Sequence, residues 1–523
     1  MRKIILAVAA IFFLTLVNAQ HTNVLIGDQG YPEEPTIMIN PKNTNEIVAG
    51  ANIDKYYYSK DGGLTWTEGT LASSYGVWGD PCIIVDTAGS FYFFHLSDLD
   101  PPAGNWIDRI VCQKADSVDG QWSDGSYTWV DGIKAQDKEW AVVDRNNNII
   151  YVTWTQFDKY PFPIPADPTD SSIILFSRSI DGGQTWSVPV RINKIAGDCV
   201  DSDNTTEGAV PTVGPNGEVY VAWAGPEGLL FDKSLDSGNT WLDNDIFVSD
   251  IPGGWDYTIS GINRCNGLPV TACDLSNSPY KGTIYINWTD QRNGTTDTDV
   301  WLSKSTDGGN TWSAAKRVND DVPGKQQFFT WMTVDQVTGY LYFVFYDRRN
   351  YNDTRTDVYM AVSKDGGETF ANFKISNSPF IPDEDVFFGD YTNISAFNNV
   401  IRPVWARYDP GQLSILTAIV DTSFLGVNNH DEPEDFSLEQ NAPNPFVENT
   451  YIGFKLHKPA LVSLKVYDIF GREMAAMINN EKYNTGKYIR HFDAAQYNLP
   501  SGVYYFSIIS NEKMLTRKML LLK

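Results

Sequence analysis

A short motif of the form Ser-x-Asp-x-Gly-x-Thr-Trp recurs along most of this 523-residue chain and constrains its fold more than any other feature. Four copies are complete, a fifth ends in Phe instead of Trp, and a sixth is shortened. Successive copies lie 55 to 71 residues apart, which is the spacing of a repeated supersecondary unit. The aspartates of the copies are Asp61, Asp119, Asp181, Asp236, Asp307 and Asp365.

Each position of the motif has a structural job. The Asp carboxylate can accept N–H groups of its own turn, the glycines permit positive φ, and the Trp supplies a large apolar plate between sheets. The motif resembles the Asp-box, or BNR repeat, of the sialidase-like β-propellers. That resemblance implies a ring of antiparallel sheets, with each box between a third and a fourth strand and with ligands bound on the opposite rim.

The strand pattern allows a count of the sheets. An apolar strand precedes each box, and a further one has no box after it; these strands cover residues 47–52, 91–95, 150–154, 219–223, 284–288, 341–345 and 401–405. Seven units in residues 20–425 leave roughly 58 residues each, enough for four strands. We predict an all-β chain with a seven-bladed Asp-box β-propeller over residues 20–425, its last sheet closed by residues 24–26. Six blades is the alternative.

The N-terminus predicts export. Residues 1–19 combine a basic start, an apolar run and a small-residue cleavage site, as in a secretory signal peptide. No later apolar run reaches 18 residues, so we expect no transmembrane segment in the mature chain. Export permits disulfides, and among the five cysteines Cys265 and Cys273 are close enough in sequence to staple one loop.

The last 88 residues, 436–523, differ from the rest. They carry more Lys and Arg than Asp and Glu, although the whole chain has a net charge of −25. Their short alternating runs predict a small β-sandwich, which the polar residues 426–435 would link to the propeller. The segments 441–446, 466–471, 499–504 and 518–523 resemble the type A C-terminal sorting domain of the type IX secretion system. This resemblance implies that the type IX machinery carries the protein through the outer membrane, for secretion or attachment at the cell surface.

The acidic balance argues against a nucleic acid partner, because such a partner needs positive potential. Two sets of acids are instead expected at the rim opposite the boxes. One precedes the inner strands and comprises Glu34, Asp80, Glu139, Glu207 and Asp390; the other follows the second strands and comprises Asp54, Asp98, Asp158, Asp290, Asp347 and Asp409. Like charges so placed need protons or a cation. Calcium suits such oxygens, and its candidate ligands are Asp198, Asp201, Asp203 and Glu207. The alternative is that these acids cap turns and pair with Arg or backbone groups.

Catalytic candidates follow from the resemblance. Active sialidases clamp a substrate carboxylate with three Arg and use a Tyr nucleophile, an activating Glu and an Asp acid/base. The candidates here are Arg292, Arg349 and Arg407 for the clamp, Tyr391 for the nucleophile, Glu139 or Glu207 beside it, and Asp80. None can be matched residue by residue to the family motif, since the N-terminal Arg-Ile-Pro is absent. Each Arg can equally pair with Asp residues and lock neighbouring blades together.

Three functions remain open from the sequence. The protein is a secreted or surface-attached sialidase-type glycoside hydrolase acting on extracellular glycans, or a non-catalytic propeller that binds glycans or proteins. A third alternative is a sortilin-like propeller that binds a peptide in an open central tunnel.

Overall fold

The computed structural model describes residues 21–99, 106–159, 169–420, 436–468, 472–510 and 513–522. The predicted signal peptide and linker lie outside these residues. All regular elements within them are β-strands, and the chain divides into two compact units between residues 421 and 422. The described residues contain no helix that is long and apolar enough to cross a membrane.

The first unit contains, in its described residues, seven antiparallel sheets of four strands. Six are consecutive meanders. Their strands are β2–β5 (Thr36–Ile39, Ile47–Ala51, Lys55–Ser59, Thr67–Thr70), β6–β9 (Cys82–Val85, Phe91–Asp98, Trp106–Ala115, Ser126–Tyr127), β10–β13 (Ala135–Asp144, Ile149–Phe157, Ser172–Ser179, Val190–Arg191), β14–β17 (Glu207–Val213, Val219–Gly225, Gly228–Ser234, Ile246–Ser249), β20–β23 (Val270–Cys273, Ile284–Asp290, Asp299–Ser305, Lys316–Arg317) and β24–β27 (Gln327–Val334, Leu341–Asp347, Asp357–Ser363, Ala371–Lys374).

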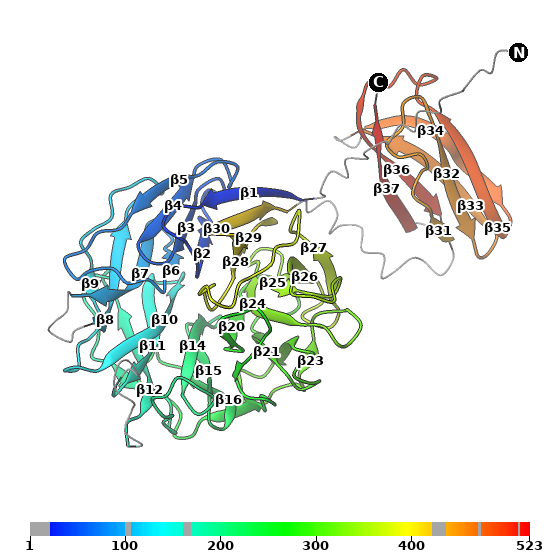
Figure 1. Cartoon of the computed structure of the whole chain (residues 1–523). Coiled ribbons are helices and arrows are strands. Elements are labelled where there is room, and N and C mark those ends of the chain that lie inside the picture. The colour runs from blue at the N-terminus through cyan, green and yellow to red at the C-terminus, as the bar shows by residue number, and fades with distance from the viewer. Residues whose placement is uncertain are drawn as a thin grey trace, which may run out of the picture. The chain divides into compact units, whose positions relative to one another are not determined.

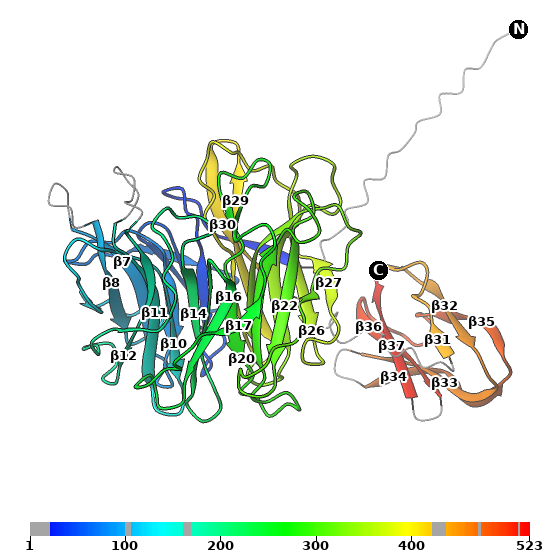
Figure 2. The same cartoon turned by 90° about the horizontal axis from the view of Figure 1, so that it is seen from below.

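The seventh sheet closes the ring. It has the order β28 (Asn393–Phe397), β29 (Val400–Asp409), β30 (Gln412–Ile419) and β1 (Thr22–Gly27), so the first strand of the chain completes the last sheet. The first strand of each sheet contacts that of the next, and β28 contacts β2. Figure 1 looks along the axis of this ring, and Figure 2 shows it from the edge. The all-β prediction is confirmed. The sequence favoured seven sheets over six, and seven four-stranded sheets occur among the described residues of this unit.

The box turns lie between third and fourth strands, as the motif predicts. In the first box, Asp61 Oδ1 accepts hydrogen bonds from Thr65 N at 2.9 Å and Leu64 N at 3.0 Å, while Thr65 Oγ1 donates to Asp61 Oδ2 at 2.6 Å. These hydrogen bonds lower the pKa of Asp61 to about 2. The box Trp packs against the neighbouring sheet: Trp312 meets Phe231 of β16 edge-on at 5.0 Å. The boxes therefore brace one sheet against the next.

The second unit has two sheets within its described residues, with the orders β31-β32-β35 and β34-β33-β36-β37. The strands are β31 (Phe436–Leu438), β32 (Asn449–Leu456), β33 (Ala460–Tyr467), β34 (Glu473–Tyr483), β35 (Gly486–Asp493), β36 (Gly502–Ser510) and β37 (Lys513–Leu521). Alternate residues Val462, Leu464 and Val466 of β33 are buried among apolar side chains of the other strands. The pairing of β34 with β33 is irregular, with register shifts at Val462/Leu464, Leu464/Lys465 and Val466/Tyr467.

The expected staple between Cys265 and Cys273 is wrong. All five cysteines are free and buried. Cys265 lies in β19 (Cys265–Asn266), which forms a short ladder with β18 (Asp256–Tyr257), whereas Cys273 ends the inner strand β20. The two cysteines thus belong to different ladders, β18–β19 and β20–β21, although only seven residues separate them in the sequence.

Candidate functional site

Acids at the starts of the inner strands converge on one lysine. Lys138 Nζ lies 2.6 Å from Asp390 Oδ2, 3.5 Å from Asp80 Oδ2 and 3.7 Å from Glu34 Oε1. All four side chains are buried, and they lie at the rim opposite the boxes. We call this group, together with Asp137, the axial cluster. The sequence predicted the three acids Glu34, Asp80 and Asp390 at this rim but missed the cation that joins them.

A second cation faces the cluster from the solvent side. Arg264 Nε donates to Asp390 Oδ1 at 2.8 Å, and its Nη2 donates to Asp390 Oδ2. Arg264 Nη1 lies 3.6 Å from Asp201 Oδ2, and the Arg264 side chain is 42% exposed. The guanidinium also lies over the Phe387 ring at 4.9 Å. Burial alone would raise the pKa of Asp390, but the charges of Lys138 and Arg264 hold it well below its usual range.

The neighbouring carboxyl groups of the cluster have pKa values shifted in opposite directions. Burial and the charge of Asp80 raise the pKa of Glu34 and of Asp137 well above the usual range. Burial also acts to raise the pKa of Asp80, but the charge of Lys138 and the neighbouring carboxyl groups of Glu34 and Asp137 outweigh it, so the pKa of Asp80 is lowered. Asp80 therefore holds a negative charge more readily than the two acids beside it.

Left-handed backbone conformations recur at the same rim. Glu34, Asp80, Lys138 and Phe329 have φ of 50°, 51°, 51° and 50°, although none of them is glycine. Lys138 lies where the pairing of β10 with β11 shifts register between Asp137 and Trp140. Such a bulge re-aims side chains, and here it lets Lys138 reach the axis. Clustered left-handed residues in a packed rim are typical of a functional site.

An aromatic-walled pocket opens beside the cluster. It holds about 120 Å³, and it is lined by Trp78, Trp106 and Phe387 together with charged residues of the cluster. Trp78 and Trp106 meet edge-on at 5.7 Å, and 38% of Trp78 is exposed. Aromatic walls with a few convergent polar groups are the usual composition of a small-ligand pocket.

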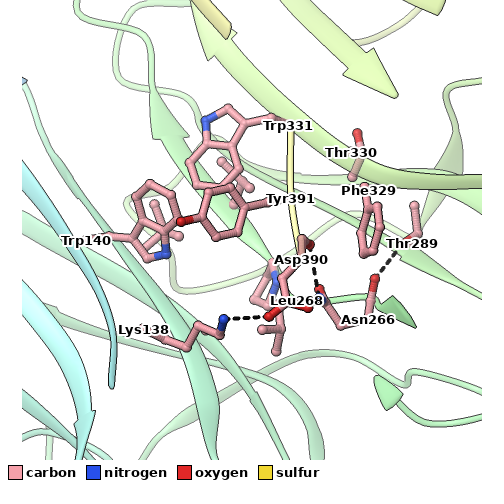
Figure 3. Close-up of a pocket in the computed structure, with 14 residues that line it drawn as sticks. Lys138, Trp140, Asn266, Leu268, Thr289, Phe329, Thr330, Trp331, Asp390 and Tyr391 are labelled. Carbon is pink, nitrogen blue, oxygen red and sulfur yellow. Dashed lines mark hydrogen bonds and ion pairs between the residues drawn. The ribbon is translucent and has the colours of Figure 1, made fainter. Parts of the chain in front are cut away.

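Three aromatic side chains close the axis next to the cluster. Trp140 lies 4.3 Å from Trp331 and 5.1 Å from Tyr391, measured between ring centroids. Figure 3 shows these rings above the Lys138–Asp390 ion pair, at a small cavity of about 30 Å³. Trp140 and Trp331 also line the axial channel on the other side. The open tunnel required by the peptide-binding alternative is therefore interrupted at this level.

The three arginines of the expected clamp are each held by carboxylates of their own. Arg292 pairs with Asp290 at 2.6 Å and lies over the Trp301 ring at 4.3 Å. Arg349 pairs with Asp347 at 2.8 Å. Arg407 and Asp409 form the third such pair. Among the described contacts, none joins these guanidinium groups to one another or to Tyr391, so the structure does not bring the expected clamp together.

The remaining acids after second strands have other partners. Asp158 accepts hydrogen bonds from Ser171 N and Oγ at 2.9 and 2.8 Å, so its carboxylate caps a turn. Asp54 lies 3.7 Å from Lys55 Nζ, and Asp98 N donates to the Tyr75 carbonyl. These acids therefore have local partners, whereas Glu34, Asp80 and Asp390 gather at the axis.

The proposed nucleophile and its companions lie buried near the cluster. Tyr391 OH and both carboxyl oxygens of Glu139 are buried without a hydrogen-bond partner, as is Glu207 Oε2. Burial raises the pKa of Glu139 and of Glu207 well above the usual range, which favours their uncharged forms. Burial and the surrounding acids also raise the pKa of Tyr391 well above its usual value. A neutral Tyr without a general base in hydrogen-bond contact is poorly prepared for nucleophilic attack.

The candidate calcium ligands have divergent partners. Asp198 Oδ1 accepts a hydrogen bond from Thr205 Oγ1 at 2.8 Å, and Asp203 Oδ1 accepts one from Asp256 N at 2.9 Å. Asp201 faces Arg264. No group of three or more His, Cys, Asp or Glu side chains able to hold a metal ion occurs among the residues that the structure describes. Calcium binding by this segment stays a prediction.

Two family models match the chain. The model described as "BNR/Asp-box repeat" matches residues 57–68, which contain the first box, and "Secretion system C-terminal sorting domain" matches residues 442–522. The chain therefore contains a BNR/Asp-box repeat in its first unit and a secretion system sorting domain at its C-terminal end. This tail supports interaction with the type IX secretion system and export to the outer membrane or cell surface.

Several solved structures are similar to this chain at low identity, each with a TM-score below 0.5. A Dyadobacter fermentans protein of unknown function is 12% identical, with a TM-score of 0.43 over 77% of this chain and 98% of its own. A PL25 ulvan lyase is 13% identical, with a TM-score of 0.46 over 75% and 95%. The Trypanosoma rangeli sialidase is 12% identical, with a TM-score of 0.39 over 87% and 85%. The comparison with curated proteins gave no match.

Proposed function

We propose that this protein is an exported glycan-binding propeller that holds a neutral sugar unit in the pocket beside the axial cluster. The observation that carries the proposal is the pairing of an aromatic wall with carboxyl groups in one pocket. Aromatic rings pack against the apolar faces of a sugar, while carboxyl oxygens and guanidinium groups bond its hydroxyls.

The charge balance favours a neutral ligand. The cations Lys138 and Arg264 lie among Asp80 and Asp390, whose pKa values are lowered, while the pKa of Glu34 is raised, so two carboxylates match the two positive charges. An anionic sugar would need an additional cation. The arginines expected to supply it are occupied by Asp290, Asp347 and Asp409.

Binding of the mature protein to an array of neutral and sialylated glycans tests this proposal. We expect neutral glycans to bind, and Trp78→Ala and Asp80→Asn each to weaken binding at least tenfold. Trp129→Ala is the matched control, because Trp129 is similarly exposed (37%) but does not line the pocket. Binding only to sialylated glycans, or binding that is indifferent to Trp78→Ala, would overturn the assignment.

A second candidate function is glycoside hydrolysis in the same pocket. The observation that favours it is that three carboxyl groups, those of Glu34, Asp80 and Asp137, line one pocket with pKa values shifted in opposite directions, since glycosidases divide acid and base roles between two carboxyl groups. Release of aryl groups from a panel of neutral and sialylated aryl glycosides tests it. Turnover that Asp137→Asn and Asp80→Asn both abolish would establish hydrolysis, whereas a panel without turnover leaves the protein a binder.

A further inference from the structure

A second and larger cavity opens at the box end of the axis. It holds about 460 Å³ and lies where the inner strands end, on the far side of the Trp140–Trp331 pair from the axial cluster. It shares Met38, Ile84 and Phe397 with the axial channel of about 210 Å³ that all seven inner strands line. The two cavities thus adjoin in one funnel, whose wall combines apolar side chains such as Met38 and Ile84 with polar ones such as Thr212 and Gln336, and which reaches Trp140 and Trp331. We call it the box-side funnel.

One cation in the funnel wall has no acidic partner. Arg145, in the turn between β10 and β11, lines both cavities and lies over the Phe397 ring at 5.8 Å. Within the described residues its guanidinium makes no ion pair and donates no hydrogen bond, whereas each other propeller arginine donates at least one. Those other arginines are Arg109, Arg178, Arg191, Arg264, Arg292, Arg317, Arg348, Arg349, Arg355, Arg402 and Arg407.

The nearby polar groups do not neutralise Arg145. Asp144 lines the same cavity, but it is buried, and its carboxylate accepts hydrogen bonds from Asn146 N at 2.9 Å and Asn147 Nδ2 at 2.8 Å. Gln336 is occupied by the backbone of Leu275 and Cys273. A second cation, Lys281, lines the cavity and forms no ion pair among the described residues. Arg145 and Lys281 are both exposed, so two cations at the mouth of the channel are open to an incoming anion in a chain whose net charge is −25.

We propose that the box-side funnel binds a carboxylate carried on an apolar chain. The carboxylate pairs with Arg145, whose planar guanidinium can bond both of its oxygens, and Lys281 adds charge. The apolar chain extends down the channel past Met38 and Ile84 toward the two tryptophans. This chemistry belongs to a free fatty acid and also to the C-terminus of an apolar peptide. The site is separate from the pocket proposed for glycans.

Titration of the full chain with sodium octanoate, followed by tryptophan fluorescence and calorimetry, tests the proposal. We expect saturable binding that tightens about three- to fourfold for each added methylene until the channel is filled. 1-Octanol should bind at least tenfold more weakly, because it lacks the charge. A hexapeptide with an apolar C-terminus, compared as free acid and amide, separates the two sources: the free acid alone binds if a chain terminus fits the funnel.

Variants locate the site. Arg145→Gln should weaken octanoate binding at least tenfold and Lys281→Gln less, while both keep the unfolding temperature, since Arg145 supports no hydrogen bond in the fold. Arg355→Gln is the matched control, because Arg355 is exposed and pairs with Asp353 on the opposite rim. Trp78→Ala, which should impair glycan binding, should leave octanoate binding intact, so the two proposals fail separately. Equal binding of octanoate and octanol, or unchanged affinity in Arg145→Gln, would overturn the inference.

Discussion

Replacement of Lys138 by Met tests the electrostatic design of the axial cluster. The lysine is buried and lies within 3.7 Å of three acids. Met fills a similar volume but leaves ionised Asp80 and Asp390 without this cation. Removing one partner of a buried ion pair costs about 3–5 kcal/mol. Because Arg264 still pairs with Asp390, we expect the lower end, about 3 kcal/mol.

This loss translates into a measurable shift of the unfolding temperature. The propeller spans roughly 400 residues, and an unfolding entropy of about 2.1 cal/mol/K per residue gives about 0.8 kcal/mol/K. A loss of about 3 kcal/mol therefore lowers the Tm by about 4 °C. Differential scanning calorimetry of the wild type and Lys138→Met at pH 7.5 measures this shift.

The pH dependence separates an electrostatic cause from a packing cause. Without Lys138 the folded-state pKa values of Asp80 and Asp390 rise, so the variant takes up protons as the pH falls and regains stability relative to the wild type. We expect the Tm difference to shrink between pH 7.5 and pH 4.5. Lys60→Met is the control: its ion pair with Asp119 is exposed, and its loss should leave the Tm unchanged. A difference that is independent of pH would refute the electrostatic explanation.

Three further predictions concern single side chains. Tyr391→Phe should change glycan binding or any hydrolysis less than twofold, because the hydroxyl has no hydrogen-bond partner; a loss of turnover would restore the tyrosine nucleophile. Asp365→Ala should cost about 1 kcal/mol in urea unfolding, because Thr369 N and Oγ1 lose their acceptor; an unchanged midpoint would contradict the bracing role of the boxes. Burial raises the pKa of Glu33 from 4.5 to about 8, so the folded state holds an extra proton and stability falls as the pH rises through this window. Glu33→Gln should flatten the Tm profile between pH 5 and pH 8.5, and a parallel profile would contradict the shift.

The fold could be predicted because the box motif is local. Ser, Asp, Gly and Thr satisfy one another within a single turn, and the predicted second strands coincide with β3, β7, β11, β15, β21, β25 and β29. Residues 24–26 fall in the outer strand of the last sheet, as expected. The disulfide estimate failed for the opposite reason, because closeness in sequence does not measure distance along extended strands.

The site was only half predictable. Acids could be placed at the rim because one occurs at the entry to the inner strand in five of the seven units. The cations could not: Lys138 reaches the axis through a β-bulge, and Arg264 lies on a short hairpin outside the repeat. The adjacent run Asp137-Lys138-Glu139, at the start of an inner strand, was the available signal, since a lysine next to the predicted axial acid Glu139 and flanked by a second acid is placed to neutralise such groups.

Distance from the axis explains why one set of acids forms a site and the other does not. Inner strands lie closest to the axis, so side chains at their starts, such as Glu34, Asp80 and Asp390, meet across the ring. Second strands lie about 4.8 Å farther from the axis, where neighbouring sheets are also farther apart. An Asp at the end of a second strand therefore finds its Arg partner in its own turn, as Asp290 and Asp347 do. Arg292 and Arg349 therefore stabilise the turns after the second strands and do not reach the axial cluster. In such a ring a charged group reaches the common centre only from an inner strand, from its bulge, or from a loop that crosses the rim as Arg264 does.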